Sequence, residues 1–412
     1  MKQLSVLVIS GLFPTPARPA AGIFIERQTT YLQKHCRQVV VVPVRVFPPM
    51  QIWKNILKPD QFGKAATQWK HELDTTPPYR EIISNTGTIV PVFYPRYTSP
   101  PRGISLGVRG YFAYPFLRTL LQRLQEQYKF DLIHAHYALP EGQIAMLAQK
   151  WMKIPLVVSI HGADLGYAVR ANELNRIMIR KVFRFASAIM VNSTKTARGV
   201  FQYCNSPEKI KLVRLGANPP PSSFNVAPQA KVVNILTVGY LIEQKGHAFM
   251  LRAIQTLIQD GYKIRYTIVG DGPEEQKLRT MCSDFGIEDS VSFEGYKAHE
   301  DVWPYFAGCD IFALPCWNEA FGLVYIEALS MGKPVVGCLG EGGPDDLHSL
   351  GDCIELVKSH DVPSLAAALK RLIDDPQRRD TMGKTGMEIV RQYYSWEQTA
   401  ANSMEIYLRV LE

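Results

Sequence analysis

Short apolar runs alternate with longer amphipathic segments along the first half of the chain. The runs lie at residues 4–9, 39–44, 132–134, 156–160, 188–191 and 210–214. Runs of this kind are typical of parallel strands that are buried on both faces. Segments with helical spacing of apolar residues lie between them, at 23–34, 106–128, 139–150 and 194–204. The alternation predicts a doubly wound α/β domain.

The same alternation begins again in the second half. Strands are predicted at 232–238, 266–269, 291–293 and 310–314, and helices at 244–260, 274–286, 299–307, 361–375, 376–391 and 395–410. A chain of 412 residues is too long for one compact core, so two domains are expected. Residues 215–230 are rich in Pro and Ser, as linkers often are. We therefore predict domains at 1–214 and 231–394, joined by this linker.

Residues 45 to about 110 have no regular periodicity. The segment contains aromatic residues, prolines and scattered basic residues, among them Trp53. One interpretation is a loop and a small helix packed on the first domain. The other is a contact region for an acceptor or a membrane, with Trp53 at the interface.

The two halves of the chain carry opposite charge. Residues 1–217 contain 29 Lys and Arg and 11 Asp and Glu, whereas the whole chain has a net charge of only +8. A basic half suits nucleic acid, an anionic substrate or the negative face of a membrane. No nucleic-acid-binding motif accompanies it, so we expect no nucleic-acid partner. One predicted amphipathic helix carries Arg176, Arg180, Lys181 and Arg184, which fits either a solvated surface or an anionic bilayer.

The cysteines and the apolar runs bear on location. Seven cysteines are scattered with no Cys-x-x-Cys spacing, which indicates small buried side chains in a reducing compartment rather than a metal site. The first apolar run is short and lacks a small-residue cleavage site, so it is expected to be a strand. No run approaches the roughly 20 residues of a membrane span. We expect a soluble, cytoplasmic protein.

Residues 311–336 carry the most informative chemistry. A strand end, a polar turn, a helix and a second strand are predicted there, with Glu319 in the turn and Glu327 about two turns into the helix. In open α/β sheets ligands bind beyond the carboxyl ends of the strands. The amides of Phe321, Gly322 and Leu323 lie at the open amino end of the helix, which attracts phosphate. Carboxylates beside such a site suggest a ligand that carries both hydroxyls and phosphate.

Three further glycine-containing turns follow or precede this unit. The first places Gly239 and Tyr240 after a strand, with Lys245 near the start of a helix, where it can bind a diphosphate. The second contains Gly270 and Gly272. The third, residues 340–346, contains Gly342 and Gly343, which allow close approach of the backbone.

The first half offers one candidate of the same kind, His161, which ends a predicted strand within His-Gly-Ala-Asp. An isolated histidine is more often structural than functional, but this one precedes a glycine at a strand end. A long Pro- and Gly-rich loop after the first strand ends at Gly22, and long loops at this position are often functional. His134 and His136 end another strand and are interpreted as supporting residues.

Together these motifs resemble the retaining glycosyltransferases of family 4, also called group 1. The most specific is Glu319-x7-Glu327 with Phe321-Gly322 between the two acids, followed by Glu-Ala-Leu-Ser-x-Gly-Lys-Pro-Val-Val. The His-Gly-x-Asp segment and the glycine turns match the family's order. The resemblance covers nearly the whole chain, and it is strongest at 232–345 and poor at 45–130.

The resemblance implies the GT-B arrangement of two facing Rossmann-like domains with the active site in the cleft between them. It implies an N-terminal acceptor-binding domain, a C-terminal nucleotide-sugar-binding domain, and a last helix, about 395–412, that packs back on the first. The implied reaction moves a sugar from a nucleotide diphosphate, a UDP-sugar more than GDP-mannose, to a glycan or lipid-linked acceptor. No metal or cofactor is implied.

The resemblance also implies roles for single residues. His161, Glu319 and Lys245 are the catalytic candidates. His161 and Glu319 are expected to contact the donor sugar, and Lys245 its diphosphate. The ribose hydroxyls are expected to bind Glu327. The other donor-binding candidates are Gly22, Gly239, Tyr240, Gly270, Gly272, Phe321, Gly322, Leu323, Gly342 and Gly343.

Two positions depart from the family pattern. Tyr240 stands where the family usually has an arginine that shares the diphosphate charge with the lysine, and Cys316 stands where serine is common. Two alternatives therefore stay open. One is an epimerase or phosphorylase on the same fold, and the other is a non-catalytic membrane- or partner-binding protein that retains the fold.

Overall fold

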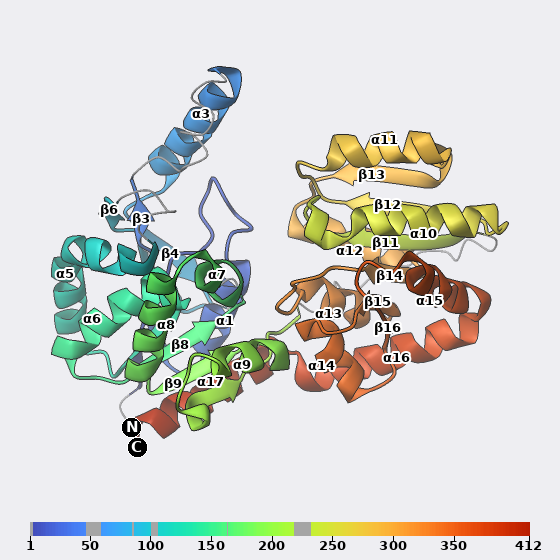
Figure 1. The fold of residues 1–412 in the computed structure, drawn as a ribbon. Coiled ribbons are helices and arrows are strands. Elements are labelled where there is room, and N and C mark those ends of the chain that lie inside the picture. The colour runs from blue at the N-terminus through green and yellow to red at the C-terminus, as the bar shows by residue number, and fades with distance from the viewer. Residues whose placement is uncertain (1–2, 47–58, 85, 100–105, 163, 218–231) are drawn as a thin grey trace. The chain divides into compact units, whose positions relative to one another are not determined.

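The backbone divides into two compact units (Figure 1). The structure is a computed structural model that describes residues 3–46, 59–84, 86–99, 106–162, 164–217 and 232–412. The first unit comprises Met1–Arg214 together with Trp396–Glu412, and the second comprises Leu215–Ser395. The segment around Trp53 lies outside the described residues. Within the described ranges, no helix has both the length and the apolar character needed to cross a bilayer.

The first unit contains an eight-stranded sheet in the order β10-β9-β8-β7-β1-β2-β5-β4. Its strands are β1 (Ser5–Ser10), β2 (Arg37–Val41), β4 (Tyr79–Ile83), β5 (Ile89–Phe93), β7 (Leu132–His136), β8 (Leu156–Ile160), β9 (Ala188–Val191) and β10 (Ile210–Leu212). All neighbours are parallel except β4, which runs antiparallel to β5 at the edge. A separate ladder joins β3 (Val44–Arg45) to β6 (Arg96–Tyr97).

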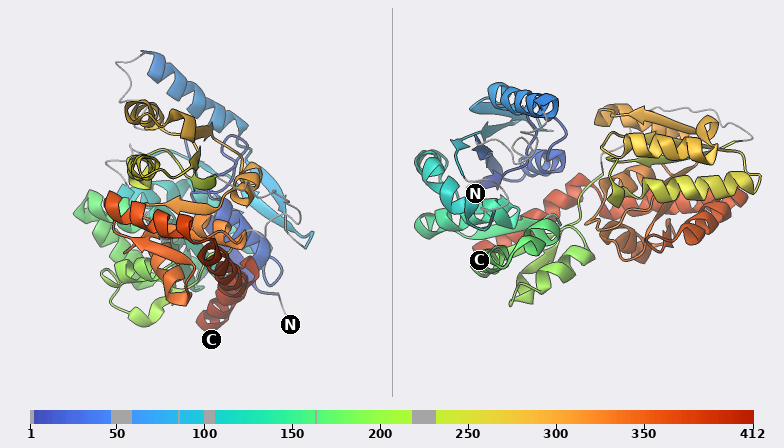
Figure 2. Two further views of the ribbon diagram at one scale, coloured as in Figure 1. Left: turned by 90° about the vertical axis from the view of Figure 1, so that its right-hand side faces the viewer. Right: turned by 45° about the horizontal axis from the view of Figure 1, so that its top comes forward.

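Helices lie on both faces of this sheet, and α3 (Pro59–Thr75) projects away from it (Figures 1 and 2). The helices described in the first unit are α1 (Ile23–Leu32), α3, α5 (Arg109–Tyr128), α6 (Gln143–Met152), α7 (Val169–Ala171), α8 (Glu173–Phe185), α9 (Thr194–Phe201) and α17 (Trp396–Leu411). Short turns of other helix types are η1 (Leu106–Val108), η2 (Ala138–Gly142), η3 (Asp164–Ala168) and η4 (Pro207–Lys209).

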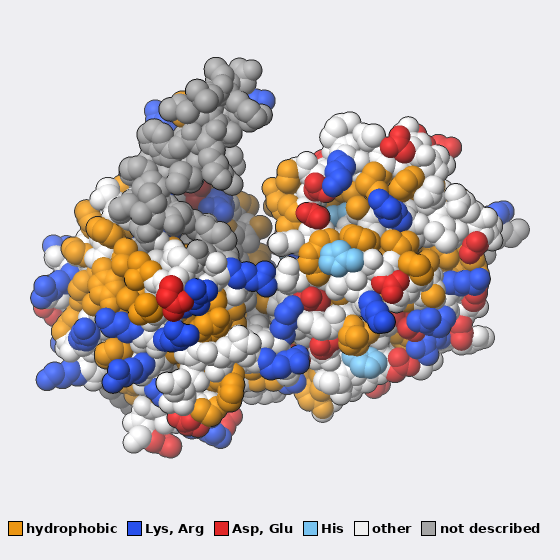
Figure 3. Space-filling model, in the orientation of Figure 1, with side chains coloured by type: hydrophobic (Ala, Val, Ile, Leu, Met, Phe, Trp, Pro, Cys, Tyr) orange, Lys and Arg blue, Asp and Glu red, His pale blue; other side chains and the backbone are white. Residues whose placement is uncertain are grey.

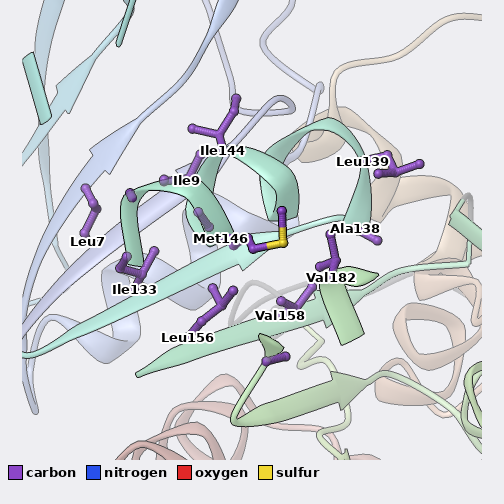
Figure 4. Close-up of a cluster of buried hydrophobic side chains, with 14 of the residues drawn as sticks. Leu7, Ile9, Ile133, Ala138, Leu139, Ile144, Met146, Leu156, Val158 and Val182 are labelled. Carbon is purple, nitrogen blue, oxygen red and sulfur yellow. The ribbon is translucent and has the colours of Figure 1, made fainter. Parts of the chain in front are cut away.

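The continuous apolar runs of the central strands reflect burial on two sides. Leu7 and Ile9 of β1 join a cluster with α5, α6 and α8, part of which is shown in Figure 4. Val6 and Val8 of the same strand join another cluster with α1 and α17. Successive side chains of a strand point to opposite faces, so a strand covered on both faces needs an apolar residue at every position.

The second unit contains a six-stranded, fully parallel sheet in the order β13-β12-β11-β14-β15-β16. Its strands are β11 (Val233–Val238), β12 (Ile264–Val269), β13 (Val291–Gly295), β14 (Ile311–Leu314), β15 (Val335–Cys338) and β16 (Ile354–Val357). Its helices are α10 (His247–Gln259), α11 (Glu275–Phe285), α12 (Trp303–Gly308), α13 (Leu323–Ser330), α14 (Gly342–Leu350), α15 (Val362–Asp374) and α16 (Pro376–Tyr393), with short turns η5 (Glu243–Lys245), η6 (Glu288–Ser290) and η7 (His299–Val302).

The apolar runs predicted the strand positions well, but two local features were not predicted. The region 45–110 contains a helix, α3, as one interpretation expected, but it also contains the hairpin β4–β5, which the sequence did not predict. The predicted loop at Gly342 and Gly343 is the first turn of α14. The extended Glu341 precedes this turn, and Pro344 in it supplies a helical φ without needing an N–H partner.

Candidate functional site

Glu319 and Lys245 form an ion pair in the second unit. Glu319 lies in the turn between β14 and α13, and Lys245 ends the short helix η5 that follows β11. Since β11 and β14 are parallel neighbours, both turns lie at the same edge of the sheet. Lys245 Nζ donates to Glu319 Oε2 over 2.6 Å, and the two side chains keep 24% and 18% of their surface exposed. Cys316 Sγ, 3.5 Å away, also donates to this oxygen.

Both members of this pair are held in their charged forms. Burial raises the pKa of Glu319, but the charge and hydrogen bond of Lys245 outweigh it, so the pKa lies below its usual range. Burial lowers the pKa of Lys245, and the negative charge of Glu319 more than reverses this effect. The second carboxylate oxygen of Glu319 accepts from the amide of Ala320 at 3.2 Å.

The turn that carries Glu319 is fixed by a second acid. The buried Glu341 accepts the amide N–H of Glu319 at 2.7 Å. Gly343 packs against this turn, since a Cβ placed on it would lie 1.9 Å from the carbonyl oxygen of Phe321. Gly322 adopts a φ of 82° as the N-cap of α13, a conformation that favours glycine. The glycines here therefore position Glu319 and the amino end of α13.

The other two glycine turns lie against each other in the same unit. A Cβ on Gly270, which has a φ of 141°, would lie 2.1 Å from the carbonyl oxygen of Gly239. A Cβ on Gly272 would lie 2.5 Å from the carbonyl oxygen of Leu241. The close packing accounts for glycine at positions 270 and 272. The Tyr240 side chain is 53% exposed at the tip of the first turn.

Glu327 is buried on α13, where it accepts a hydrogen bond from His299. It lies just over one turn into the helix, not two as expected, because α13 begins only at Leu323. His299 Nε2 lies 2.8 Å from Glu327 Oε1. No sequence pattern indicated His299, which is 28 positions away on a short turn and belongs to no recognised motif.

In the first unit, His161 follows β8 and contacts three aromatic rings. They belong to Phe24, His136 and Tyr137, with centroids 4.8 to 5.3 Å from that of His161. Burial lowers the pKa of His161 to about 3, so the ring is neutral at physiological pH. The Nδ1 atom is buried and has no hydrogen-bond partner among the described residues. That nitrogen is therefore a buried polar atom whose hydrogen-bonding capacity is unused within the described residues.

Two neighbouring groups hold His161 in place. The buried Asp164 accepts the amide N–H groups of Ala138 at 2.6 Å and of His161 at 3.3 Å. Its pKa is raised to about 6 by burial, although these bonds oppose the shift. His136 Nδ1 lies 3.0 Å from His161 Nε2. Asp164 belongs to the His-Gly-x-Asp segment, but the pattern alone did not indicate this bracing role.

The remaining histidine, His134, ties the sheet to the last helix. Its Nδ1 lies 2.6 Å from Tyr407 Oη of α17, and its Nε2 lies 2.8 Å from Ser159 Oγ. Burial lowers its pKa to about 3. The expectation of a supporting role for His134 and His136 fits these contacts.

Gly22 lies two residues before Phe24, whose ring contacts His161. It is the N-cap of α1 with a φ of 70°, and a Cβ on it would lie 2.5 Å from the carbonyl oxygen of Leu12. Phe24, in the first turn of α1, has its ring against His161. The candidates thus form two groups, one around His161 in the first unit and one around Glu319 and Lys245 in the second. Among the described residues, no cluster of three or more His, Cys, Asp or Glu could hold a metal ion.

Two family models match this chain. The model described as glycosyl transferases group 1 matches residues 222–388, and that described as glycosyltransferase family 4 matches residues 74–219. The chain is 28% identical over 303 residues to the D-inositol 3-phosphate glycosyltransferase of Corynebacterium aurimucosum, a match that covers 68% of this chain and 71% of that protein. It is 26% identical over 381 residues to the putative teichuronic acid biosynthesis glycosyltransferase TuaC of Bacillus subtilis, covering 89% of each.

The fold is also found among solved structures. HepE from Anabaena, solved in complex with UDP and glucose, matches with a TM-score of 0.68 at 19% identity, over 98% of this chain and 99% of that one. This likeness shows a shared GT-B fold of two Rossmann-like domains. With two family models that match residues 74–219 and 222–388, the chain belongs to the family 4, group 1 glycosyltransferases.

Proposed function

We propose that the protein is a retaining, metal-independent glycosyltransferase that moves a sugar from a nucleoside diphosphate, UDP in preference to GDP, to an acceptor hydroxyl. The observation that carries the proposal is the ion pair of Lys245 and Glu319 at the strand ends, beside the amino end of α13. HepE was solved with UDP and glucose, which supports a UDP-sugar donor here.

The charges of this group suit the proposed reaction. The bond between the anomeric carbon of the donor sugar and the phosphate oxygen breaks, and a bond from that carbon to the acceptor oxygen forms. The proton of the acceptor hydroxyl passes to the departing diphosphate. The diphosphate gains negative charge as it leaves, and Lys245 and the amides of residues 321–323 stabilise that charge. Glu319 holds hydroxyls of the donor sugar and Glu327 those of the ribose. In the first unit, His161 is the candidate for contact with a substrate, because its Nδ1 has no hydrogen-bond partner among the described residues.

Nucleoside diphosphate release tests this proposal. The full chain is incubated with UDP- and GDP-sugars and a lipid extract as acceptor, and UDP or GDP is quantified with time. We expect release with one base only, and a loss of about a hundredfold or more in Glu319→Gln, the scale of removing one preorganised polar group. Glu275→Gln, on the surface of α11, is the matched control. Release that is equal in the wild type and Glu319→Gln would contradict the assignment.

On the acceptor side, we propose a lipid-linked or glycan acceptor of envelope polysaccharide assembly, at the cytoplasmic face of an anionic membrane. The similarity to TuaC supports a polysaccharide product. The surface of α8 supports the membrane: Leu174, Ile177 and Phe185 are 40%, 47% and 40% exposed. Figure 3 shows hydrophobic side chains flanked by Lys and Arg on the part of the first unit where α5 and α8 lie.

The polar residues of the same surface suit a bilayer interface. Lys181 Nζ donates to Tyr111 Oη of α5 at 3.1 Å, and Trp151 Nε1 of α6 donates to Tyr114 Oη at 2.6 Å. Arg184 lies in the last turn of α8. Amphipathic aromatic side chains beside basic ones are typical of surfaces that rest in the headgroup region.

Flotation with liposomes tests the membrane proposal. We expect the wild type to float with vesicles that contain anionic lipid and not with neutral ones. The double variant Ile177→Ser/Arg184→Glu should lose flotation, whereas Arg252→Glu/Arg265→Glu, on the exposed surface of the second unit, should retain it. Binding that is unchanged in the first variant would refute this surface.

A further inference from the structure

The hydrogen bond between His299 and Glu327 joins two parts of the second unit that are both rigidly anchored. Glu327 belongs to α13, and Tyr325 of the same helix donates its hydroxyl to the carbonyl oxygen of Leu314 in β14 at 2.8 Å. Tyr325 is fully buried. The helix that carries the carboxylate is therefore fixed to the central part of the sheet.

His299 is anchored through a series of aromatic contacts. Its ring meets the ring of Trp303 edge to face, with centroids 5.7 Å apart and an interplanar angle of 86°. Trp303 packs on Phe306 at 6.0 Å, and Phe306 packs on Phe312 of β14 at 5.6 Å. Trp303 and both phenylalanines are buried. The imidazole is thus held against the same strand that anchors α13.

The bond leaves one carboxylate oxygen of Glu327 for a ligand. An ionised carboxylate only accepts hydrogen bonds, so the His299 ring donates from Nε2 to Oε1. The side chain of Glu327 is 10% exposed, and Oε2 has no partner recorded in the part of the chain that the structure describes. A carboxylate whose plane is fixed in advance loses less rotamer freedom when it accepts the two hydroxyls of a ribose.

We propose that His299 is a positioning residue that orients Glu327 for the vicinal 2′- and 3′-hydroxyls of the donor nucleotide. His299 acts through Glu327 and does not itself touch the sugar. The inference rests on the proposed function, because it requires Glu327 to bind the ribose of a nucleoside diphosphate. It adds that the affinity for the ribose depends on a residue outside the Glu319-x7-Glu327 signature.

Calorimetric titration with UDP and with 2′,3′-dideoxy-UDP tests this role, because the second ligand lacks both hydroxyls. If the nucleoside diphosphate release assay shows that the donor carries guanine, GDP and 2′,3′-dideoxy-GDP replace these two ligands. In His299→Phe we expect the affinity for UDP to fall about tenfold or more, the effect of losing a hydrogen bond to a charged group. The affinity for 2′,3′-dideoxy-UDP should change less than about twofold, since the missing hydroxyls remove the interaction that the variant disturbs.

Two further variants separate positioning from a structural effect. The amide nitrogen of glutamine reaches about as far as Nε2 of histidine, so His299→Gln should restore most of the UDP affinity. His348→Phe, an exposed histidine on α14, should change neither ligand's affinity. An equal loss for both ligands in His299→Phe, or no loss for UDP, would overturn the proposal.

The experiment also distinguishes failure of this inference from failure of the proposed function. If the wild type binds neither UDP nor GDP, or if Glu327→Ala binds as the wild type does, the donor site itself is wrong and the inference falls with it. If the wild type binds and Glu327→Ala does not, but His299→Phe binds both ligands normally, only the role of His299 is refuted.

Discussion

Removal of Lys245 should destabilise the second unit by leaving Glu319 charged, largely buried and without its cation. Breaking a buried pair by deleting one partner typically costs about 3–5 kcal/mol. Here Lys245 and Glu319 keep 24% and 18% of their side-chain surface exposed. The amide of Ala320 still donates a hydrogen bond to the Glu319 carboxylate. We therefore expect Lys245→Met to lower the free energy of unfolding by roughly 2–3 kcal/mol, at or below the low end of that range.

A double-mutant cycle separates the pair from the rest of the site. Glu319→Gln removes the charge, and adding it to Lys245→Met removes the uncompensated carboxylate. The double variant should therefore be more stable than the sum of the single losses predicts, with a coupling of about 1–2 kcal/mol. Urea unfolding at neutral pH, followed by circular dichroism, measures all four proteins, and equal m values show that the same surface is exposed in each.

The pH dependence gives a second readout of the same pair. The pKa of Glu319 is lowered in the folded state, mainly by Lys245 acting against burial. The stability that ionised Glu319 contributes is therefore fully present above the pKa of Glu319 in the unfolded chain. It is lost as the pH falls through the lower pKa of Glu319 in the folded protein. Lys245→Met should lose less stability on acidification than the wild type. A coupling below about 0.5 kcal/mol in the cycle, within the scatter of independent sites, would refute the reasoning.

Three further predictions follow from buried contacts. Gly343→Ala should lower the free energy of unfolding by about 2 kcal/mol or more, because its Cβ would lie 1.9 Å from the Phe321 carbonyl oxygen. Gly308→Ala, with open space around the added Cβ, should not destabilise the protein. Urea unfolding compares the two variants, and equal midpoints would contradict the packing argument. Tyr407→Phe should cost about 1–3 kcal/mol by removing the partner of His134 Nδ1, a loss that calorimetry would detect and that an unchanged melting temperature would exclude. Burial lowers the pKa values of His134, His136, His161 and His247 below 6.5 in the folded state. The stability that they contribute above pH 6.5 should therefore be lost as the pH falls, at up to about 1.4 kcal/mol per pH unit for each histidine. Equal unfolding midpoints at pH 7.5 and 5.5 would contradict this.

The parts of the fold that the sequence predicted are those in which one physical requirement dominates. The strand containing Leu7 and Ile9 is covered on both faces, so every position is apolar and the run is visible in the sequence. Edge strand β4 has no such requirement: Ile83 is 74% exposed, and only Ile82 at 5% is well buried. Periodicity could not identify a strand whose side chains are mostly exposed.

The residues of the candidate site also divide into those that the sequence predicted and those that only the tertiary structure brings together. Glu319, Lys245 and the glycine turns follow parallel strands, so topology alone brings them to one edge of the sheet. His299 meets Glu327 only because the aromatic contacts from Trp303 to β14 place it there. Contacts between residues far apart in the sequence and outside any motif depend on tertiary packing, which a single sequence does not reveal.

Titration of the full chain with UDP, GDP and ADP tests the central claim, a nucleotide-sugar site on the second unit, most directly. The account predicts that one base, uracil by preference, binds at least tenfold more tightly than the others. It also predicts that Glu327→Ala weakens this binding at least tenfold, while Glu275→Ala on the surface of α11 leaves it unchanged. Binding that is absent for all three nucleotides, or that survives in Glu327→Ala, would contradict the account.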